Sequence, residues 1–230
     1  MTERQKEILG AIVKEHVETS KPVGSKVILG KLGISLSSAT IRSEMVKLEK
    51  EGLIQQPHTS AGRVPTDKAY RWYIKSLGKK SLSEHEQEAL KRKLNSFEDP
   101  ERQLRMIADT LSELTYCTAV VTLSSQDVYT RGFGYMMRNP EFEERNRALS
   151  VADLFDHLSE FMNNLPKISK DVLYVGEDNP YLRKANCSLL VAPYRMHDRE
   201  GVIGILGPAR MSYEKNISLL DFITESLGEF

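Results

Sequence analysis

The chain has little that would point to a secreted, membrane-bound or metal-binding protein. It contains two cysteines in 230 residues. They form neither a disulfide framework nor a zinc-site spacing, so we expect Cys117 and Cys187 to be buried, reduced thiols. No apolar run approaches the roughly 20 residues that a membrane span needs. The charged start of the chain lacks the apolar stretch of a signal peptide. These absences predict a cytoplasmic protein that contacts no membrane.

Aromatic residues and net charge are also scarce. Aromatic residues make up 7% of the chain, with a single tryptophan, which predicts a mostly aliphatic core. The 32 Lys and Arg residues balance 32 Asp and Glu residues. This balance hides an asymmetry, because residues 1–80 carry a net charge of +7 and the remainder carries −7. Either the first part meets a polyanion such as DNA or RNA, or the division is a chance distribution of solubilising charge.

Three helices are predicted over the first 52 residues. Thr2 and Gln5 have the spacing of a capping box, and the apolar periodicity extends a helix from there to about residue 18. Ser25 can cap a short second helix that Gly33 ends in the left-handed conformation. The third helix buries one face, formed by Ile41, Met45 and Leu48.

A β-hairpin is predicted to follow the three helices. Two short strands, residues 53–56 and 63–66, flank a loop rich in turn-forming residues, and Asp67 can cap a fourth helix. Three helices followed by a hairpin is the order of a winged helix. We therefore expect residues 1–77 to form a winged helix-turn-helix domain that binds double-stranded DNA.

The remainder of the chain predicts a helical connector at 78–115 and a further domain at 116–230. Asp99 and Pro100 have the pattern of an N-cap followed by the first residue of a helix. After residue 116, apolar strand-like runs and amphipathic helices follow without a steady βαβ order, so we assign the fold class α+β. The expected strands cover 117–123, 172–175, 188–192 and 202–206, and the expected helices cover 151–165 and 211–227.

The outward face of the third helix is predicted to read DNA, because the second helix of a helix-turn-helix lies in the major groove. Arg42 can donate two hydrogen bonds to a guanine, or it can pair with a carboxylate such as Glu44 or Glu49. Serine hydroxyls at the helix start can contact phosphate or act only as caps. The candidate contacts from this helix are Ser37, Ser38, Thr40, Arg42, Ser43 and Lys47.

The loop between the two strands and the start of the fourth helix supply further candidates. The loop has hydroxyl groups, an arginine and a glycine, which fits a segment that follows the DNA backbone or enters a minor groove. The histidine can equally be solvated or bonded within the turn. Basic residues on the fourth helix can neutralise phosphates without adding sequence information. These candidates are His58, Thr59, Ser60, Arg63, Lys68 and Arg71.

Several long motifs resemble the bacterial heat-inducible transcription repressor family, HrcA. The first domain carries ATIRSEM at 39–45 and QPHTSAGRVPTDK at 56–68. The C-terminal part carries elements similar to those of the family, namely NPEF at 139–142, VGEDNP at 175–180 and GVIGILGPARMSY at 201–213. Ala209 and Ser212 depart from the usual pattern of the last element.

The resemblance implies a repressor of heat-shock (chaperone) operons. Family members bind an inverted-repeat operator as homodimers, are helped into their active form by the GroE chaperonin, and are released on heat stress. They have a GAF-like C-terminal domain. This chain is shorter than usual members, and the missing length falls around residues 123–138, where the family carries an inserted dimerising domain. We therefore expect 116–230 to be a truncated GAF-like regulatory and dimerisation domain, with the connector and the C-terminal helix as candidates for pairing.

The C-terminal half contains no set of residues with the types and spacing of a catalytic site. Glu177 and Asp178 are adjacent and do not form a general acid–base pair, and the glycines at 201–207 lack the Lys-Ser/Thr of a phosphate loop. Arg210 can bind an anion or ligand, or it can pair with Asp221 or another acid. We expect no enzyme activity, no cofactor and no metal. The alternative function is a transcription regulator whose GAF-like domain binds a small molecule.

Overall fold

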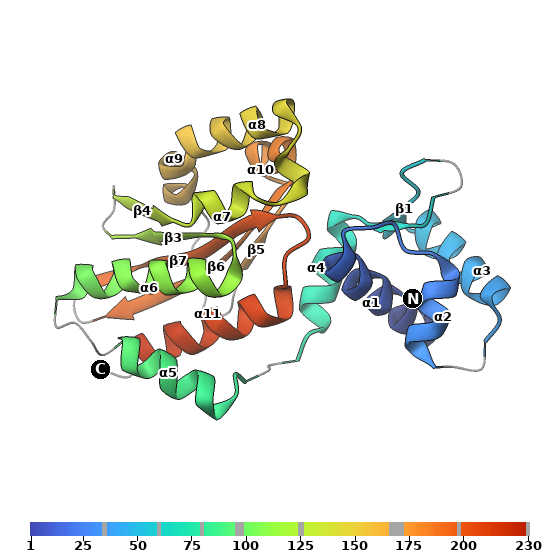
Figure 1. The fold of residues 1–230 in the computed structure, drawn as a ribbon, viewed down its shortest axis with the longest axis horizontal. Helices are drawn as coiled ribbons and strands as arrows, with labels where there is room; N and C mark the ends of the chain where they lie inside the picture. Colours follow the sequence, from blue (N-terminus) through green and yellow to red (C-terminus); the bar gives the residue numbers. More distant parts are fainter. Residues whose placement is uncertain are drawn as a thin grey trace. The chain divides into compact units, whose positions relative to one another are not determined.

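The computed structural model describes residues 1–33, 36–58, 61–78, 81–94, 99–123, 127–165, 173–196 and 199–228. The chain divides into two compact units, Met1–Gly78 and Lys79–Phe230 (Figure 1). Helices and β-sheets occur in both units, which confirms the α+β class. Within the described ranges, no helix combines the length and the apolar character that crossing a membrane requires.

The described residues of the first unit form four helices and a two-stranded sheet. Its core is aliphatic, as expected, and includes Ile8, Ile12, Ile28, Ile41 and Leu48, all fully buried. The elements are α1 (Glu3–Thr19), α2 (Ser25–Leu32), α3 (Ser38–Lys50), β1 (Ile54–Gln55), β2 (Val64–Pro65) and α4 (Asp67–Ser76).

The ends of these helices follow some of the sequence signals and not others. The capping box at the start of α1 is confirmed, since the Gln5 N–H donates to Thr2 Oγ1 and the Thr2 N–H donates to Gln5 Oε1. The left-handed conformation of Gly33 is also confirmed, with φ of 58°. The prediction that Ser25 caps α2 is wrong, because Gly24 is the N-cap. Ser25 instead shares a 2.9 Å hydrogen bond between hydroxyl groups with Ser38 of α3.

The start of α4 also differs from the expectation. Thr66 is the N-cap, and its hydroxyl donates to the Gly52 carbonyl (2.7 Å) instead of capping the helix. Asp67, the expected cap, is the first residue of α4. Its carboxylate accepts from Arg71 Nε one turn later (2.5 Å), so an ion pair within the helix has replaced the cap.

The second unit is built on a five-stranded sheet in which all neighbouring strands are antiparallel. The strand order is β4-β3-β7-β6-β5. The strands are β3 (Thr118–Thr122), β4 (Val128–Arg131), β5 (Leu173–Val175), β6 (Cys187–Met196) and β7 (Arg199–Pro208). The helices are α5 (Glu84–Leu94), α6 (Pro100–Thr115), α7 (Phe133–Met137), α8 (Arg145–Asp156), α9 (Leu158–Asn163), α10 (Pro180–Ala185) and α11 (Tyr213–Gly228), and the 3₁₀ turn η1 spans Pro140–Phe142.

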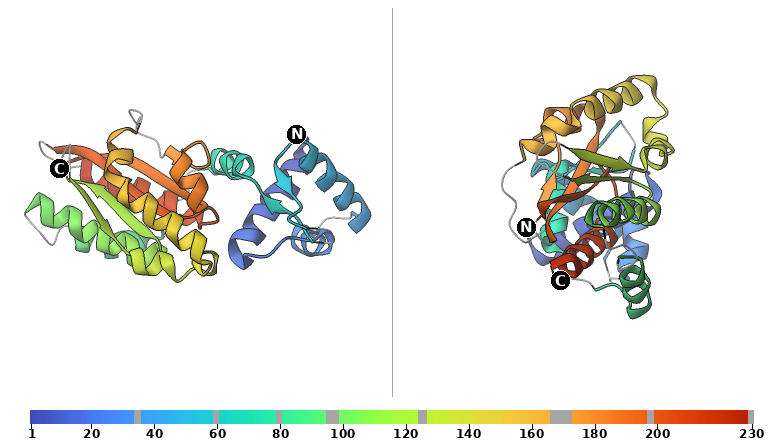
Figure 2. Two further views of the ribbon diagram at one scale, coloured as in Figure 1. Left: turned by 90° about the horizontal axis from the view of Figure 1, so that it is seen from above. Right: turned by 90° about the vertical axis from the view of Figure 1, so that its left-hand side faces the viewer.

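Helices cover both faces of this sheet, with α6 and α11 on one side and α8, α9 and α10 on the other (Figures 1 and 2). Side chains of a strand alternate between the faces, so each long strand supplies two cores. On β6, Leu189 and Val191 join the core beneath α8, α9 and α10. Leu190, between them, is equally buried and belongs to the opposite face, where α11 contacts the strand. A sheet buried on both faces explains the continuous apolar runs in β6 and β7.

Several elements of the second unit differ from the predicted boundaries. Asp99 caps α6 and Pro100 begins it, as expected. Helices α5 and α6, which lie in the segment 78–115 expected as a connector, belong to the second compact unit, and α6 contacts β3 and β4. The helix expected over 151–165 is interrupted at His157, where α8 ends and α9 begins. Strand β4 and helices α7 and α10 were not predicted.

Both cysteines are free and buried, as expected from the sequence. Desolvation disfavours the charged thiolate, so burial raises the pKa of Cys117 to about 12 and raises the pKa of Cys187 as well. Thiols in such surroundings are poor nucleophiles and poor metal ligands.

Candidate nucleic-acid interface

Helix α3 separates its residues into a buried face and an outward face. The predicted apolar face is present, since Ile41, Met45 and Leu48 are at most 4% exposed. Ser37 is the N-cap, and its hydroxyl accepts from the Thr40 N–H (3.0 Å). The outward face carries six exposed residues in a stripe along the helix: Ala39, Arg42, Ser43, Val46, Lys47 and Lys50.

A buried carboxylate ties α3 to α1. Glu44 is 8% exposed and accepts a hydrogen bond from Gln5 Nε2 of α1 (3.1 Å). Its other oxygen accepts from Lys47 Nζ (2.8 Å), and this bond is the main reason why the pKa of Glu44 lies below its usual value. A charge that is paired and hydrogen-bonded can stay buried at low cost. The hydrogen bond from Gln5 to Glu44 therefore attaches α3 to α1 and helps to set the direction in which the outward stripe faces.

The hydroxyl groups at the start of α3 are engaged within the protein. Ser37 and Thr40 share a 2.9 Å hydrogen bond between their side chains, and Ser38 is bonded to Ser25. The sequence left two roles open for the Ser37 hydroxyl, contact with phosphate or capping of the helix. In this structure it caps the helix. Ser43 lies one turn further along and is exposed.

Arg42 lies on the outward face of α3 and is exposed. The two carboxylates expected as its alternative partners are bound elsewhere, because Glu44 bonds Lys47 and Gln5 while Glu49 bonds Arg63. Within the described part of the chain, no ion pair holds the Arg42 guanidinium. The side chain predicted to contact a guanine is therefore exposed at the surface.

The hairpin after α3 is held against the segment between α1 and α2. Strands β1 and β2 pair Ile54 with Pro65. An isolated bridge then joins Val23 to Arg63, with the Val23 N–H donating to the Arg63 carbonyl (2.8 Å) and the Arg63 N–H donating to the Val23 carbonyl (2.9 Å). Gly62 lies so close to this segment that an added Cβ would be 2.5 Å from the Val23 carbonyl carbon. The base of the hairpin loop is thus fixed to the body of the unit.

The candidate residues of the hairpin loop have different surroundings. His58 is exposed, and its carbonyl accepts from the Ala61 N–H (3.0 Å). Thr59 and Ser60 lie outside the described residues. The Arg63 side chain, expected to reach DNA, pairs with Glu49 of α3, with 3.0 Å between Nη2 and Oε2. This arginine is 16% exposed, because its backbone forms the bridge to Val23 and its side chain turns back to α3.

The two basic candidates of α4 also contact the protein. Lys68 is exposed and donates from Nζ to the Glu51 carbonyl just after the end of α3 (2.8 Å). Arg71 is half-buried and bonded to Asp67. Lys68 needs only to release one surface hydrogen bond to contact a phosphate, whereas Arg71 would have to leave an ion pair.

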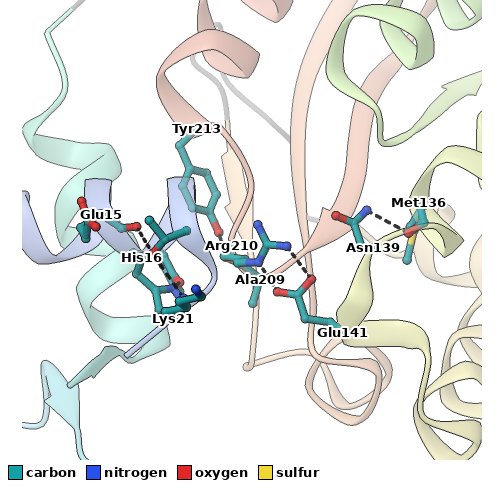
Figure 3. A network of polar contacts seen from close by, with 11 residues as sticks. Glu15, His16, Lys21, Met136, Asn139, Glu141, Ala209, Arg210 and Tyr213 are labelled. Atoms are coloured by element: carbon teal, nitrogen blue, oxygen red, sulfur yellow. Dashed lines mark hydrogen bonds and ion pairs between the residues drawn. The ribbon is translucent and has the colours of Figure 1, made fainter. Parts of the chain in front are cut away.

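Arg210, in the second unit, forms an ion pair with Glu141 (Figure 3). Its Nε and Nη2 donate to the two carboxylate oxygens, the second at 3.1 Å. In the same close-up, Asn139 Nδ2 donates to the Met136 carbonyl (2.9 Å), and the Tyr213 hydroxyl donates to the Ala209 carbonyl. The sequence left two alternatives for Arg210, which were contact with an anion or ligand and pairing with an acid. The structure contains the pairing, and the acid is Glu141 and not Asp221. The pair joins the motifs at 139–142 and 201–213.

Three residues of the outward stripe were not predicted from the sequence. Lys50 extends the positive charge of the face to the end of α3. Ala39 and Val46 are exposed apolar residues between the polar ones, and Val46 is 39% exposed. The helical spacing could have revealed all three, because residues 39, 43, 46 and 50 repeat at steps of four and three. Ala39 and Val46 were missed because the candidate contacts to DNA were chosen for their polar side chains, and these two residues are apolar.

Comparisons with known proteins relate the chain to one family. A family model described as the HrcA protein C-terminal domain matches residues 36–217. A heat-inducible transcription repressor HrcA from Thermodesulfovibrio yellowstonii is 27% identical, with 99% of this chain and 97% of the relative covered. A protein of the same name from Caldanaerobacter subterraneus subsp. tengcongensis is 26% identical, with 99% and 96% covered. The first alignment spans 337 positions against 230 residues here, so the relative has residues without counterparts in this chain.

A solved structure shares the fold. A crystal structure described as that of a hypothetical protein superposes with a TM-score of 0.77. It covers 100% of this chain and 98% of its own, at 18% sequence identity. At this level of identity, the likeness concerns the arrangement of elements alone.

Proposed function

This chain belongs to the HrcA family of heat-inducible transcription repressors, and on that premise we propose that it represses chaperone operons by binding an inverted-repeat operator as a homodimer. The observation that carries the proposal is the outward stripe of α3. Arg42, Ser43, Lys47 and Lys50 are exposed on one face of this helix. A hydrogen bond between Gln5 and Glu44 attaches the helix to α1. A helix presented in this way can enter a major groove, which is about 12 Å wide.

The first unit supports this role as a winged helix-turn-helix domain over residues 1–77. Helices α2 and α3 form the helix-turn-helix pair, and β1, β2 and the Val23–Arg63 bridge form the base of the wing. The net charge of +7 on residues 1–80 favours approach to a polyanion. We expect His58, Lys68 and the start of α3 to meet phosphates on either side of the groove.

We assign the second unit, which includes the helices of the segment expected as a connector, to regulation and pairing. Its antiparallel sheet with helices on both faces is compatible with the GAF-like domain that the resemblance implies. Two copies are required because each half of an inverted repeat takes one reading helix. Helices α5, α6 and α11 are the candidates for the contact between copies. The GroE chaperonin is the proposed assistant, the cytoplasm is the proposed location, and the function requires no catalysis.

A gel-shift experiment tests the proposal. We expect the protein to retard a duplex that carries an inverted-repeat operator, to leave a scrambled duplex of equal composition free, and to lose the operator after mild heating. Addition of chaperonin should restore the active fraction. Equal retardation of both duplexes would reject a sequence-specific repressor, because phosphate contacts alone carry no sequence information.

Two substitutions separate base reading from phosphate binding. Arg42→Ala should lower the preference for the operator over a random duplex by about 1–3 kcal/mol, since a bidentate contact to guanine contributes that much discrimination. Lys68→Ala should weaken binding to every sequence and reduce the slope of log affinity against log salt by about one. Fluorescence anisotropy at several salt concentrations measures both effects. Equal effects of the two changes on operator and random DNA would contradict the assigned roles.

A ligand-sensing regulator is the second candidate, for which an open surface pocket between α9 and α10 is the place to test. The pocket has a volume of about 330 Å³, and His157 and Tyr181 stack at its edge with ring centroids 4.7 Å apart. Glu160, Asn164 and Asp178 add polar groups to its lining. A thermal-shift screen with a metabolite panel, followed by gel shifts with any stabilising compound, distinguishes this function. A compound that changes operator affinity would favour it over regulation by heat.

A further inference from the structure

The outward stripe of α3 contains two apolar residues that the proposed reading of DNA leaves unexplained. Ala39 and Val46 are exposed, while the core beneath α3 is already supplied by Ile41, Met45 and Leu48. A single exposed valine is ordinary on a protein surface. These two residues, however, lie on the same line of the helix as Ser43 and beside Arg42, which are the polar groups best placed to contact base edges.

The spacing of the stripe matches stacked base pairs. Residues 39, 43 and 46 follow one another at steps of four and three, so their side chains lie on one face. With a rise of about 1.5 Å per residue, Ala39 and Val46 are separated by about 10 Å along the helix axis. Base pairs in B-DNA stack at about 3.4 Å. The two apolar side chains are therefore about three base pairs apart if the helix lies along the groove.

The chemistry of the major groove identifies what these side chains can recognise. Thymine presents a C5-methyl group there, which is the largest apolar group that a base exposes in that groove, and each base pair also presents hydrogen-bond donors or acceptors. Alanine and valine have no polar side-chain atom, so placing them against an amino group or a carbonyl oxygen would remove its water without replacing the hydrogen bond. Against a methyl group, the same contact buries apolar surface from both sides.

We propose that Ala39 and Val46 are specificity residues that each contact the C5-methyl group of a thymine in the operator half-site. Arg42 and Ser43 lie between them along the helix and take the hydrogen-bonding edges of the intervening base pairs. This inference rests on the proposed function. It adds a requirement for the thymine methyl group at two positions, which hydrogen bonds to base edges do not impose.

Hydrogen bonds that hold α3 to α1 and to the hairpin give its exposed face the fixed orientation that a methyl contact needs. Glu44 is bonded to Gln5 of α1, and Glu49 is bonded to Arg63 at the base of the hairpin loop. The helix is thus attached on two sides, and the exposed face cannot rotate freely. Lys50 follows Val46 on the same face and is placed to contact phosphate beyond the second thymine, whereas Lys47 Nζ is bonded to Glu44. A methyl contact depends on distances of about 4 Å, so it needs this fixed orientation.

Replacement of thymine by deoxyuridine tests the proposal, because uracil keeps every hydrogen-bonding group and lacks only the C5-methyl group. The duplex is first selected from a random-sequence library with the wild-type protein. Each thymine of the half-site is then replaced singly, and affinities are measured by fluorescence anisotropy. We expect replacement at two positions to weaken wild-type binding by about threefold to tenfold, in line with the burial of one methyl group.

The variant Val46→Ala identifies the partner of one thymine. It should bind the unmodified duplex more weakly and should lose its sensitivity to deoxyuridine at one of the two positions, while keeping the sensitivity at the other. Val27→Ala is the matched control, since Val27 is an exposed valine on α2 with 43% exposure. That variant should keep both sensitivities. The unfolding transition followed by Trp72 fluorescence should be unchanged in both, because each valine lies on a helix surface.

The outcomes separate this inference from the proposed function. If the library yields no preferred sequence, the sequence-specific repressor is rejected and the methyl contacts with it. If a preferred sequence binds but deoxyuridine changes nothing at any position, the function stands and the two methyl contacts are wrong. If Val46→Ala keeps full sensitivity at both positions, Val46 does not contact either methyl group.

Discussion

Replacing Gly132 by alanine should destabilise the second unit by about 3 kcal/mol, a large effect for the addition of a single methyl group. Gly132 precedes α7 with φ of +88°, in the left-handed region. An added Cβ would lie 2.5 Å from the Cys117 carbonyl oxygen and 2.5 Å from Ser112 Cβ. The left-handed conformation costs an alanine about 1–2 kcal/mol, and overpacking in a closed site adds about 1–3 kcal/mol.

The position of Gly132 explains why the strain cannot relax locally. Cys117 connects α6 to β3, and Ser112, which is 2% exposed, lies on the last turns of α6. The Gly132 carbonyl accepts the Tyr135 and Met136 N–H groups at the start of α7. Met136 is fully buried in the core beneath α8 and α9. A shift at Gly132 therefore moves α6, the edge strand β4 and a core side chain together.

Gly134→Ala is the control for this prediction. Gly134 lies two residues further, inside α7, and an added Cβ there meets nothing within 4 Å. Alanine is favoured over glycine in a helix by about 0.5–1 kcal/mol, so this variant should be as stable as the wild type or slightly more so. Calorimetry resolves the unfolding of the second unit, while fluorescence of Trp72, the one tryptophan, reports on the first. Equal stability of the two variants would contradict the close approach at Gly132.

The sequence predicted those parts of the fold that depend on neighbouring residues. The capping box of Thr2 and Gln5, the Asp99–Pro100 start of α6 and the buried spacing of Ile41 and Met45 all involve residues within four positions of one another. Continuous apolar runs also located β3, β6 and β7, because a strand covered on both faces is apolar throughout. The mixed α+β class followed from their order.

The features that the sequence did not predict depend on contacts distant in the chain. Glutamate is a surface residue by type, yet Gln5 and Lys47 allow the burial of Glu44. Arg63 pairs with Glu49 because the hairpin returns to α3. This contact depends on the tertiary fold, so residue composition does not predict it. Strand β4 was missed because it is short and lies at an edge, where its residues are half-exposed and lack an apolar run. Such an edge strand is defined by its neighbour β3.

The division of the helix expected over 151–165 has a local cause. At His157 the backbone leaves the helical region, with φ of −105° and ψ of 6°. The His157 ring Nδ1 lies 2.8 Å from the Asp153 carbonyl oxygen, one turn earlier, which replaces a bond that the continuing helix would make. The turn redirects α9 so that Leu158, Phe161 and Met162 all join the core on that face of the sheet.

Replacing Gly62 by alanine should lower the stability of the first unit by about 2 kcal/mol and weaken DNA binding. The φ angle of Gly62 is not in the left-handed region, so the effect comes from space alone. An added Cβ would lie 2.5 and 2.6 Å from the carbonyl carbon and oxygen of Val23 and 2.7 Å from the Pro22 carbonyl carbon. These are backbone atoms, which cannot rotate away as a side chain does, and overpacking of this kind costs about 1–3 kcal/mol.

The strain should act first on the bridge between Val23 and Arg63. Its two hydrogen bonds, of 2.8 and 2.9 Å, place the hairpin loop beside the start of α2. If the strands separate, the loop that carries His58 moves and the Arg63–Glu49 pair loosens. Binding to an operator should fall by about tenfold, which corresponds to the loss of one or two hydrogen bonds of about 1 kcal/mol each.

The pattern of the loss distinguishes displacement of the hairpin from general unfolding. Helix α3 keeps its attachment to α1 through Gln5 and Glu44, so the Gly62→Ala protein that remains folded should keep the wild-type sensitivity to deoxyuridine while binding all duplexes more weakly. Gly10→Ala on α1 is the control, because an added Cβ there meets nothing within 4 Å. Trp72 fluorescence in denaturant measures stability, and anisotropy measures affinity. Wild-type stability together with wild-type affinity in Gly62→Ala would exclude both the close contact with Val23 and a role of the hairpin in binding DNA.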